Sequence, residues 1–509
     1  MSVQHEISRL RRNSEAAWRR FDFETSAELL RQAHKLSPQD PRLLLDLGYQ
    51  SGLRYDYNQA REYFEKAIRV SGWQTAAFVA AGAHCISFSQ PTMAQDYFER
   101  ALKKQPDSAE VLVLLAEVYE RFGHLDAAEG LVTRATGIAP GNVLGQLLQA
   151  KVWRRQKRVL EAEVVLREVA GRAHPDLWAV AQVWYELGLN LDVQARYDEA
   201  MAAFLEAKKL LLPPTEKAYE AHQQSQQERQ VEYAALTGET WKKFRAEGAN
   251  LPPARRMAFL VGHPRSGTTL LEQVLDAHPA AVSLEETRIF HESSSALLSR
   301  VKKESGQPDW LANLVTAQLP PVRENYFAQA EKFLGQPVGG RLLIDKNPSL
   351  TVSVSQIASI FPEAKFLVAL RDPRDVCLSC FMQPLPPAVV NTAYLTLERA
   401  VHEYASLMGL WLASRDQMAA PWLEVRYEDT VVDLAATARR ALHFLELPWD
   451  ERVLGFHEHA QAKLVRSPTY ADVGKPIYKT SLGRWQHYQK YLEPHLDRLK
   501  PFIKAFGYE

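Results

Sequence analysis

The N-terminal part of the chain repeats one pattern of small and large apolar residues at a fixed interval. A small residue opens each copy, at Ser26, Ala60, Ala94, Ala128, Ala162 and Ala200. A large apolar residue follows four positions later, at Leu30, Phe64, Phe98, Val132, Leu166 and Phe204. Residues four apart lie on one face of an α-helix. Because the first five copies are 34 residues apart, the pattern predicts a series of similar amphipathic helices.

Each copy also predicts an earlier helix. In five copies a glycine or alanine lies twelve residues before the opening residue, at Gly48, Gly82, Ala116, Ala150 and Gly188. Small residues let two helices cross closely, and the large apolar residues would fill the gap between them. Pro38, Pro106 and Pro140 are placed to end the later helix of their copies. The unit is therefore a helix pair.

This pattern is typical of the tetratricopeptide repeat (TPR), and residues 8–214 resemble that family. The resemblance implies about six helix pairs stacked into an α-solenoid, because one pair cannot bury its apolar face alone. A groove along such a solenoid would bind a protein or peptide partner. The alternative is a scaffold or dimerisation surface that holds a second copy of the chain as a homodimer.

A change of pattern marks the end of the repeats. After Pro213 and Pro214 comes a polar, Gln-rich stretch, which predicts a capping or connecting helix that runs to Gly248. Residues 215–252 are thus expected to join the repeats to a second domain over 253–509. That domain opens with the apolar run MAFLVG at 257–262, which predicts a buried parallel strand.

The strand leads into a loop suited to binding an anion. HPRSGTT follows at 263–269, and LLEQVLDAH continues with helical spacing. A strand, a glycine-containing loop and a helix direct backbone N–H groups and a helix N-terminus at a phosphate. Gly262 and Gly267 have the spacing of the nucleoside-triphosphate loop, but Thr268 stands where that loop has lysine. Loss of the lysine and the presence of Arg265 disfavour ATP chemistry.

The loop sequence PRSGTT resembles the 5′-phosphosulfate loop of the sulfotransferases, whose donor is 3′-phosphoadenosine 5′-phosphosulfate (PAPS). The resemblance implies that the donor is bound by Arg265, Ser266, Gly267, Thr268 and Thr269. It also implies a second phosphate site, and KFLVALRDPRDVCLSCF at 365–381 has the matching strand and helix. Arg371 at the strand end and Ser379 in the helix would bind the 3′-phosphate.

Residues 255–509 are most similar to the tyrosylprotein sulfotransferases. LDAHPAAVSLEETRIF resembles a stretch of that group in which the second glutamate, here Glu286, is the catalytic base. The next arginine, Arg288, would help to bind an acidic substrate. LLIDKNP at 342–348 implies a transition-state role for Lys346, and WLEVRYED at 422–429 implies a cofactor contact for Tyr427.

The last resemblance is to the loop that covers the cofactor, at RSPTYADVGKPIYKTSLGRW over 466–485. It implies that Arg484 contacts the donor. The family's catalytic serine aligns without gaps to Thr469, whereas Ser467 needs a shift, so either hydroxyl remains a candidate. Adenosine 3′,5′-bisphosphate would be the product, and no metal is needed.

Composition limits the alternatives. Lys plus Arg and Asp plus Glu are both 61, and the zero net charge argues against bulk nucleic-acid binding. Three cysteines cannot form a disulfide framework, and the lone pair Cys377 and Cys380 lacks further zinc ligands. No stretch reaches the roughly 20 apolar residues of a membrane span, and the N-terminus lacks a signal-peptide core, which predicts a cytoplasmic protein.

The sequence therefore predicts an α plus α/β chain in two parts. A TPR α-solenoid precedes a three-layer α/β/α, P-loop-like sulfotransferase domain with a mainly parallel sheet. The predicted reaction is PAPS-dependent sulfuryl transfer to a hydroxyl, either of a small molecule or of a tyrosine in a peptide held by the repeats. The alternatives are a kinase or nucleotide hydrolase of related fold, and a non-catalytic TPR adaptor that binds nucleotide.

Overall fold

The computed structural model describes residues 3–20, 22–252, 255–386, 388–462, 474–475, 477 and 481–509. By compactness the chain divides into two units. Unit 1 comprises Met1–Val165 with Glu331–Gly335, and unit 2 comprises Leu166–Ala330 with Gln336–Glu509. The division into repeats over 8–214, a connector over 215–252 and a domain over 253–509 stays a prediction.

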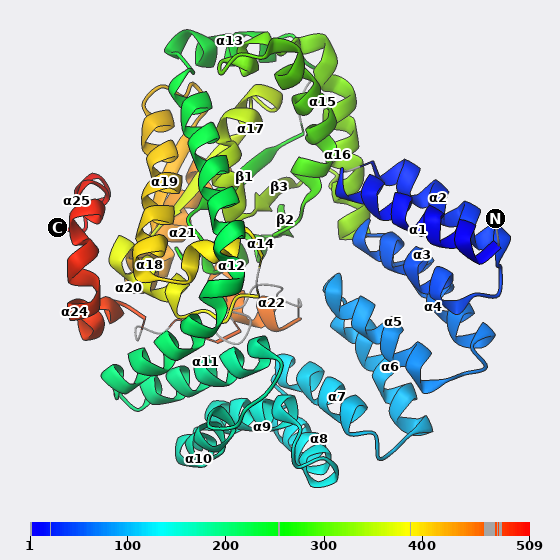
Figure 1. Cartoon of the computed structure of the whole chain (residues 1–509). Coiled ribbons are helices and arrows are strands. Elements are labelled where there is room, and N and C mark those ends of the chain that lie inside the picture. Colours follow the sequence, from blue (N-terminus) through cyan, green and yellow to red (C-terminus); the bar gives the residue numbers. More distant parts are fainter. Residues whose placement is uncertain are drawn as a thin grey trace. The chain divides into compact units, whose positions relative to one another are not determined.

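The repeats are helix pairs, labelled in Figure 1. Their bounds are α1 Val3–Arg19, α2 Phe23–Leu36, α3 Pro41–Leu53, α4 Tyr57–Val70, α5 Thr75–Ser87, α6 Pro91–Lys104, α7 Ala109–Arg121, α8 Leu125–Ile138, α9 Val143–Arg155, α10 Val159–Ala170, α11 Leu177–Val193 and α12 Tyr197–Ala234. Helices α2, α6 and α8 each end two residues before Pro38, Pro106 and Pro140, as predicted.

The predicted close crossing is present in the pairs α3–α4 and α5–α6. A Cβ atom on Gly48 of α3 would lie 2.4 Å from the Phe64 ring of α4. Gly82 and Phe98 have the same relationship at 2.4 Å. These contacts require glycine, because real Cβ atoms do not approach other atoms within 3.0 Å. The regular spacing of small and large residues therefore encodes how the helices pack.

Helix α12 differs from the expectation of a new helix after Pro214. It runs through Pro213 and Pro214 to Ala234, and α13, Gly238–Gly248, follows as a separate helix. Bonds within unit 2 hold α12 on both sides of the prolines. Lys208 Nζ donates to the Tyr394 carbonyl at 2.6 Å, and His222 Nε2 lies 2.6 Å from a Glu403 oxygen. These buried contacts outweigh the two hydrogen bonds that the prolines remove.

A five-stranded parallel sheet forms the centre of unit 2. Its strands are β1 Met257–Gly262, β2 Ala281–Glu285, β3 Leu342–Lys346, β4 Lys365–Leu370 and β5 Trp422–Arg426. Their order across the sheet is β2-β3-β1-β4-β5, and each neighbouring pair is parallel. Helices connect the strands, as parallel pairing requires. The predicted fold class, a helical repeat region and a parallel α/β domain, is confirmed.

Further helices of the chain complete the layers. They are α14 Thr268–Asp276, α15 Ile289–Ser305, η1 Trp310–Asn313, η2 Thr316–Gln318, α16 Leu319–Leu334, η3 Pro348–Ser353, α17 Val354–Ile360, α18 Pro373–Phe381, η4 Val390–Tyr394, α19 Leu397–Arg415, α20 Tyr427–Val432, α21 Leu434–Phe444, η5 Glu451–Gly455, α22 Phe456–Ala462, η6 Arg484–Tyr488, α24 Gln489–Leu492, η7 Glu493–His495 and α25 Leu496–Ala505.

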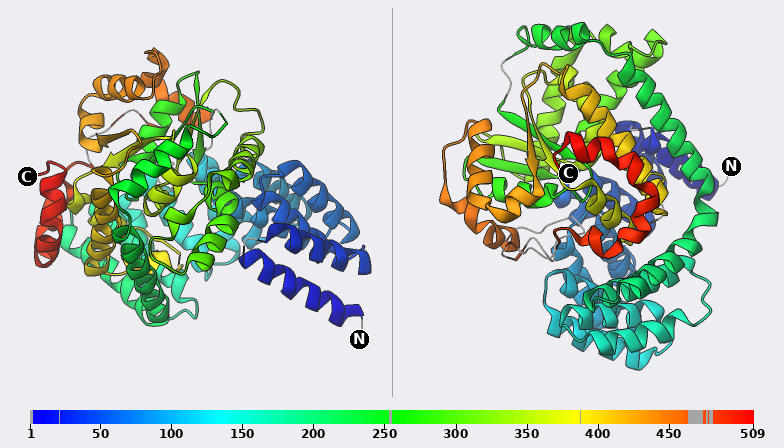
Figure 2. Two further views of the ribbon diagram at one scale, coloured as in Figure 1. Left: turned by 90° about the horizontal axis from the view of Figure 1, so that it is seen from above. Right: turned by 90° about the vertical axis from the view of Figure 1, so that its left-hand side faces the viewer.

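Alternate residues of the central strand face the two helical layers. Leu260 of β1 belongs to a core that includes Leu271 of α14 and Leu442 of α21. Phe259, its neighbour, packs on the other face against Phe290 of α15 and Tyr326 of α16. In the right-hand view of Figure 2, α21 and α22 (orange) lie on one side of the sheet. Within the described residues, no helix is long and apolar enough to cross a membrane.

Candidate active site

A residue or loop singled out from the sequence lies at the carboxyl end of each of the five strands. Glu286 follows β2, and Lys346 is the last residue of β3. The phosphate loop follows β1, Arg371 follows β4, and Tyr427 follows β5. The strands are parallel, so these ends share one edge of the sheet. Ligands of open parallel sheets bind at this edge.

The phosphate loop has the backbone of an anion-binding turn. Gly262 and Gly267 have positive φ angles of 134° and 87°, and Arg265 has one of 72°. Helix α14 begins directly after Gly267, and no side chain caps its N-terminus. The backbone N–H groups of Thr268 and Thr269 are the first two of the helix, and they therefore remain directed at the loop. A Cβ on Gly267 would lie 2.5 Å from Cδ2 of Tyr427, so this loop admits only glycine.

Arginine side chains gather beside this loop. Arg265 Nε donates to Ser379 Oγ at 3.1 Å, which links the loop to α18. Arg371 donates to the Arg265 carbonyl at 3.4 Å, and its guanidinium lies 4.9 Å from the centre of the Tyr427 ring. Nε of Arg371 is buried and has no partner among the described residues. A buried guanidinium donor without an acceptor fits a phosphate oxygen.

Lys346 is surrounded by carboxylates. Its side chain is 0% exposed, and Nζ lies 2.9 Å from Glu286 Oε1, 3.3 Å from Glu272 Oε2 and 3.6 Å from Glu285 Oε1. Nζ also donates to Thr269 Oγ1 in the phosphate-loop helix at 3.4 Å. Burial alone would lower the lysine pKa, but the charges of Glu272, Glu286 and Glu285 outweigh it and raise that pKa. Lys346 is therefore a fixed cation beside the loop.

The two adjacent glutamates differ in accessibility. The Glu285 side chain is 2% exposed, whereas that of Glu286 is 35% exposed. Glu286 has a φ of 50°, and its N–H donates to the Lys346 carbonyl at 2.8 Å. A positive φ at a non-glycine residue is strained and persists where the surroundings hold it, often at functional sites. Only Glu286 of the two is open to a substrate.

Asp345, the neighbour of Lys346, faces the helical layer that contains α16. Its Oδ2 accepts a hydrogen bond from the Tyr326 hydroxyl at 2.9 Å, and its Oδ1 is buried without a partner among the described residues. Burial raises the pKa of Asp345 to about 7. Since Tyr326 and Lys346 both favour the charged form, burial is the stronger effect.

The remaining predicted residues lie apart from this group or outside the described chain. Arg288 is exposed and immediately precedes α15. Arg484 makes an ion pair with Asp192 of α11 at 2.7 Å, and Tyr488 donates to the same carboxylate at 2.6 Å. Thr469 and Ser467 lie outside the residues that the structure describes.

Two site residues were not found from the sequence. Glu272 contacts Lys346, and its Oε1 accepts from Ser283 Oγ at 2.5 Å. The helical spacing of Thr268 and Glu272, which puts both on one face of α14, was the available signal. Asp375 of α18 accepts from the N–H groups of Gly483 and Trp485 at 3.0 and 2.8 Å. It thereby positions the segment that carries Arg484.

The chain matches known families in both halves. Residues 258–451 match the sulfotransferase family, and residues 86–152 match the tetratricopeptide repeat. The C-terminal half therefore carries a sulfotransferase-family domain, and the N-terminal half carries TPR repeats. Both parts of the predicted resemblance are confirmed, and homologues of the C-terminal half include protein-tyrosine sulfotransferases.

Individual relatives are distant. Protein-tyrosine sulfotransferase A of Caenorhabditis elegans is 28% identical over 266 residues, which cover 49% of this chain and 67% of that protein. Protein-tyrosine sulfotransferase 1 of Danio rerio is 28% identical over 245 residues, 45% of this chain and 65% of that protein. An uncharacterized protein of Aquifex aeolicus (strain VF5) is 24% identical over 419 residues, 81% of this chain. The chain spans 53% of the length of that protein.

Among solved structures, the sulfotransferase domain from the Synechococcus PCC 7002 olefin synthase is similar to this chain at 22% sequence identity and a TM-score of 0.33. The match covers 46% of this chain and 90% of that domain.

Proposed function

We propose that this chain is a sulfotransferase that moves a sulfuryl group from PAPS to an acceptor hydroxyl, leaving adenosine 3′,5′-bisphosphate. The observation that carries the proposal is the pair of Lys346 and Glu286. A buried cation and an accessible carboxylate lie 2.9 Å apart at the ends of β3 and β2, on one side of the phosphate loop that follows β1. Transfer of a sulfuryl group to a hydroxyl uses a base that takes the hydroxyl proton and a fixed positive charge beside the leaving phosphate oxygen.

The donor would be bound on the β1, β4 and β5 side of the edge. The N–H groups at the start of α14 and the side chains of Arg265, Ser266, Thr268 and Thr269 suit the 5′-phosphosulfate. Arg371 and Ser379 suit the 3′-phosphate, because the Arg371 Nε lacks an acceptor among the described residues. Tyr427 fits against Gly267 at the same place. When bound, the donor supplies the sulfuryl group and a phosphate leaving group.

Side chains of the protein would then take the proton of the acceptor hydroxyl and stabilise the negative charge that develops on the leaving phosphate oxygen. Glu286, the exposed member of the pair, takes the proton of the acceptor hydroxyl. Lys346 stays protonated and stabilises the negative charge that grows on the bridging oxygen. One such fixed donor contributes about 3–4 kcal/mol to lowering a barrier. Arg288, exposed just before α15, would contact the acceptor, and Arg484 would contact the donor after leaving Asp192.

The repeats supply a second part of the proposal. TPR arrays bind peptides or proteins along their stacked helices, so unit 1 would hold a protein or peptide partner or a second copy of the chain. A tyrosine in such a peptide is one acceptor class, and a small hydroxyl compound is the other.

Calorimetric titration with adenosine 3′,5′-bisphosphate, AMP and ATP, each with and without Mg²⁺, tests the proposal. We expect the bisphosphate to bind without Mg²⁺ and at least tenfold more tightly than AMP. Arg371→Met and Ser379→Ala should remove this preference, because they remove the contacts to the 3′-phosphate. ATP binding that is tighter and requires Mg²⁺ would instead indicate a kinase or hydrolase. Bisphosphate binding with no transfer of radiolabelled sulfate to any acceptor would indicate the adaptor.

A further inference from the structure

One buried hydroxyl binds both peptide groups of Gly262, the residue at which β1 becomes the phosphate loop. The Gly262 N–H donates to Thr351 Oγ1 at 2.8 Å, and the same hydroxyl donates to the Gly262 carbonyl at 2.7 Å. Thr351 lies in η3 and is 1% exposed. Water therefore does not compete for these two bonds.

The Thr351 side chain takes the place of a strand neighbour that is missing. The last pair between β1 and β3 is Leu260 opposite Lys346. The Asn347 N–H still donates to the Leu260 carbonyl at 3.1 Å, and the chain then turns into η3. Residues two apart in a strand direct their peptide groups to the same side, so those of Gly262 face the side that β3 has left. The Thr351 hydroxyl binds them there.

Gly262 depends on this contact because glycine does not hold its own conformation. Its φ is 134°, and a Cβ would lie 2.4 Å from the Ala369 carbonyl oxygen of β4, so only glycine fits. Glycine is also the residue with the greatest backbone freedom. The direction in which the loop leaves β1 is therefore set by the neighbours of Gly262, which are β4 on one side and Thr351 on the other.

The groups suited to an anion follow directly after this point. Four residues separate Gly262 from Gly267, where α14 begins, and the Ser266 N–H closes this turn by donating to the His263 carbonyl at 3.2 Å. Binding groups have to be held within about 0.5 Å of their place by the residues behind them. A change of direction at Gly262 would move Arg265 and the first N–H groups of α14 together.

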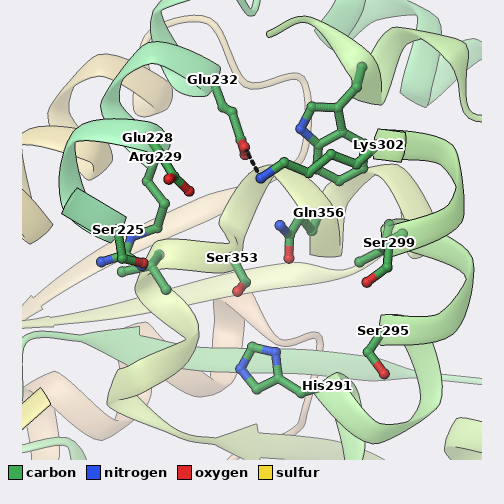
Figure 3. Close-up of a pocket in the computed structure, with 13 residues that line it drawn as sticks. Ser225, Glu228, Arg229, Glu232, His291, Ser295, Ser299, Lys302, Ser353 and Gln356 are labelled. Atoms are coloured by element: carbon green, nitrogen blue, oxygen red, sulfur yellow. Dashed lines mark hydrogen bonds and ion pairs between the residues drawn. The ribbon is translucent and has the colours of Figure 1, made fainter. Parts of the chain in front are cut away.

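The segment that carries Thr351 also has a second face. Val352, Ser353 and Gln356 line a pocket of about 320 Å³ between α12, α15 and the η3–α17 segment, and Figure 3 shows the side chains of Ser353 and Gln356 there. Neither Thr351 nor a residue of the phosphate loop belongs to this lining. Ser353 directly precedes α17, and its side chain does not cap that helix. It offers a hydroxyl in the same segment for comparison with Thr351.

We propose that Thr351 is a positioning residue of the phosphate loop, whose hydroxyl sets the affinity for a 5′-phosphate without touching the nucleotide. This role rests on the proposed function, in which the loop binds the 5′-phosphosulfate. It does not extend to the 3′-phosphate, for which Arg371 and Ser379 are the proposed contacts. Thr351 therefore acts on a nucleotide through its 5′ group alone.

Calorimetric titration of the full chain with AMP, adenosine 3′-monophosphate and adenosine 3′,5′-bisphosphate tests this role. Thr351→Val keeps the shape of the side chain but lacks the hydroxyl. We expect it to weaken binding of AMP and of the bisphosphate at least tenfold, by similar factors, and to leave the 3′-monophosphate within twofold. Thr351→Ser keeps the hydroxyl and should bind all three nucleotides within threefold of the wild type. Ser353→Ala is the matched control and should stay within twofold for all three.

A second variant covers the case in which Thr351→Val does not fold. Thr351→Cys has a thiol, which is a weak donor and acceptor, so AMP and the bisphosphate should each bind at least threefold more weakly. Equal weakening of all three nucleotides would overturn the inference, because the effect would then not be confined to the 5′-phosphate. Unchanged AMP affinity in the variant that folds, or a Thr351→Ser chain as weak as Thr351→Val, would also overturn it.

The wild-type chain separates this inference from the function on which it rests. If it binds the bisphosphate and the variants fail as described, Thr351 has no positioning role and the sulfotransferase proposal stands. If the wild-type chain does not bind the bisphosphate, both the inference and the proposed function are overturned.

Discussion

Arg484 makes an ion pair with Asp192, with 2.7 Å between its terminal nitrogen and a carboxylate oxygen. The two residues are 292 positions apart, and Asp192 belongs to the last helix pair before the sheet. The same arginine is the one that the resemblance assigns to the donor. If Arg484 contacts the donor as the proposed function has it, the Asp192 carboxylate would compete with the donor's phosphate for the guanidinium.

Asp192→Asn should therefore tighten binding of adenosine 3′,5′-bisphosphate, by about three- to tenfold, because the amide keeps the hydrogen bond from Tyr488 but lacks the competing charge. Asp198→Asn is the matched control, since Asp198 pairs with Lys490 and Tyr491 in the same way but not with Arg484. Titration calorimetry measures both. Equal affinities in the two variants would show that Arg484 does not contact the ligand.

Glu286→Gln should lower kcat by about 10²- to 10⁴-fold, because the variant keeps the shape of the side chain but has no base. Binding of the bisphosphate should stay within twofold, since Glu286 lies on the side of Lys346 and not of Arg371. Steady-state transfer of labelled sulfate and calorimetry provide the two readouts. Wild-type kcat in this variant would exclude Glu286 as the base.

Lys346→Met should lower stability by about 3–5 kcal/mol, because it leaves the buried carboxylates of Glu272 and Glu285 without their cation. Adding Glu272→Gln should recover part of this loss, whereas Glu272→Gln alone should not stabilise the chain. The comparison is a double-mutant cycle on the apparent melting temperature. Additive effects of the two substitutions would mean that the 3.3 Å contact contributes nothing.

Gly267→Ala should abolish binding of the bisphosphate, because its Cβ would lie 2.5 Å from the Tyr427 ring and its φ is 87°. Gly306→Ala separates the two causes. Gly306 also has a positive φ, of 62°, at the end of α15, but a Cβ there meets nothing within 4 Å. That variant should lose about 1 kcal/mol of stability and bind normally. Calorimetry and thermal unfolding of both variants check the prediction.

Asp345 should make the stability of the chain fall as pH rises from about 4 to about 7. Burial raises its pKa to about 7 in the folded state, whereas an exposed aspartate titrates near ~3.9. The folded chain then binds more protons than the unfolded chain over that range, so unfolding becomes easier as pH increases. Asp345→Asn removes the titrating group and should flatten this part of the profile. Thermal unfolding from pH 4 to pH 8 measures the slope in both chains.

The sequence predicted the parts of the site that local patterns encode. The strands β1, β3 and β4 end at Gly262, Lys346 and Leu370, and a glycine or charged residue, Gly262, Lys346 and Arg371, marks the transition from buried strand to site. No local sequence pattern indicates which distant segments contact each other in the site. The pairing of Glu272 with Lys346 depends on the order of strands, because β3 enters the sheet beside β1, whose helix carries Glu272.

In one place, contacts between distant parts of the chain outweigh what the local sequence predicts. Pro213 and Pro214 normally end a helix, yet α12 continues through both. The bonds of Lys208 and His222 to residues near position 400 stabilise the continuous helix. Nothing in the local sequence indicates those partners, so the helix bounds over this region were beyond prediction from pattern alone.

The strand order also determines when the site can form during synthesis. β1 emerges from the ribosome first, but its neighbours in the sheet, β3 and β4, follow roughly eighty and a hundred residues later. Tyr427, which packs against Gly267, comes later still. A nascent chain that has translated the phosphate loop therefore has neither Lys346 nor Arg371 beside it. On the proposed function, nucleotide would bind only after these later strands are made, so the helix pairs made before them would fold without it.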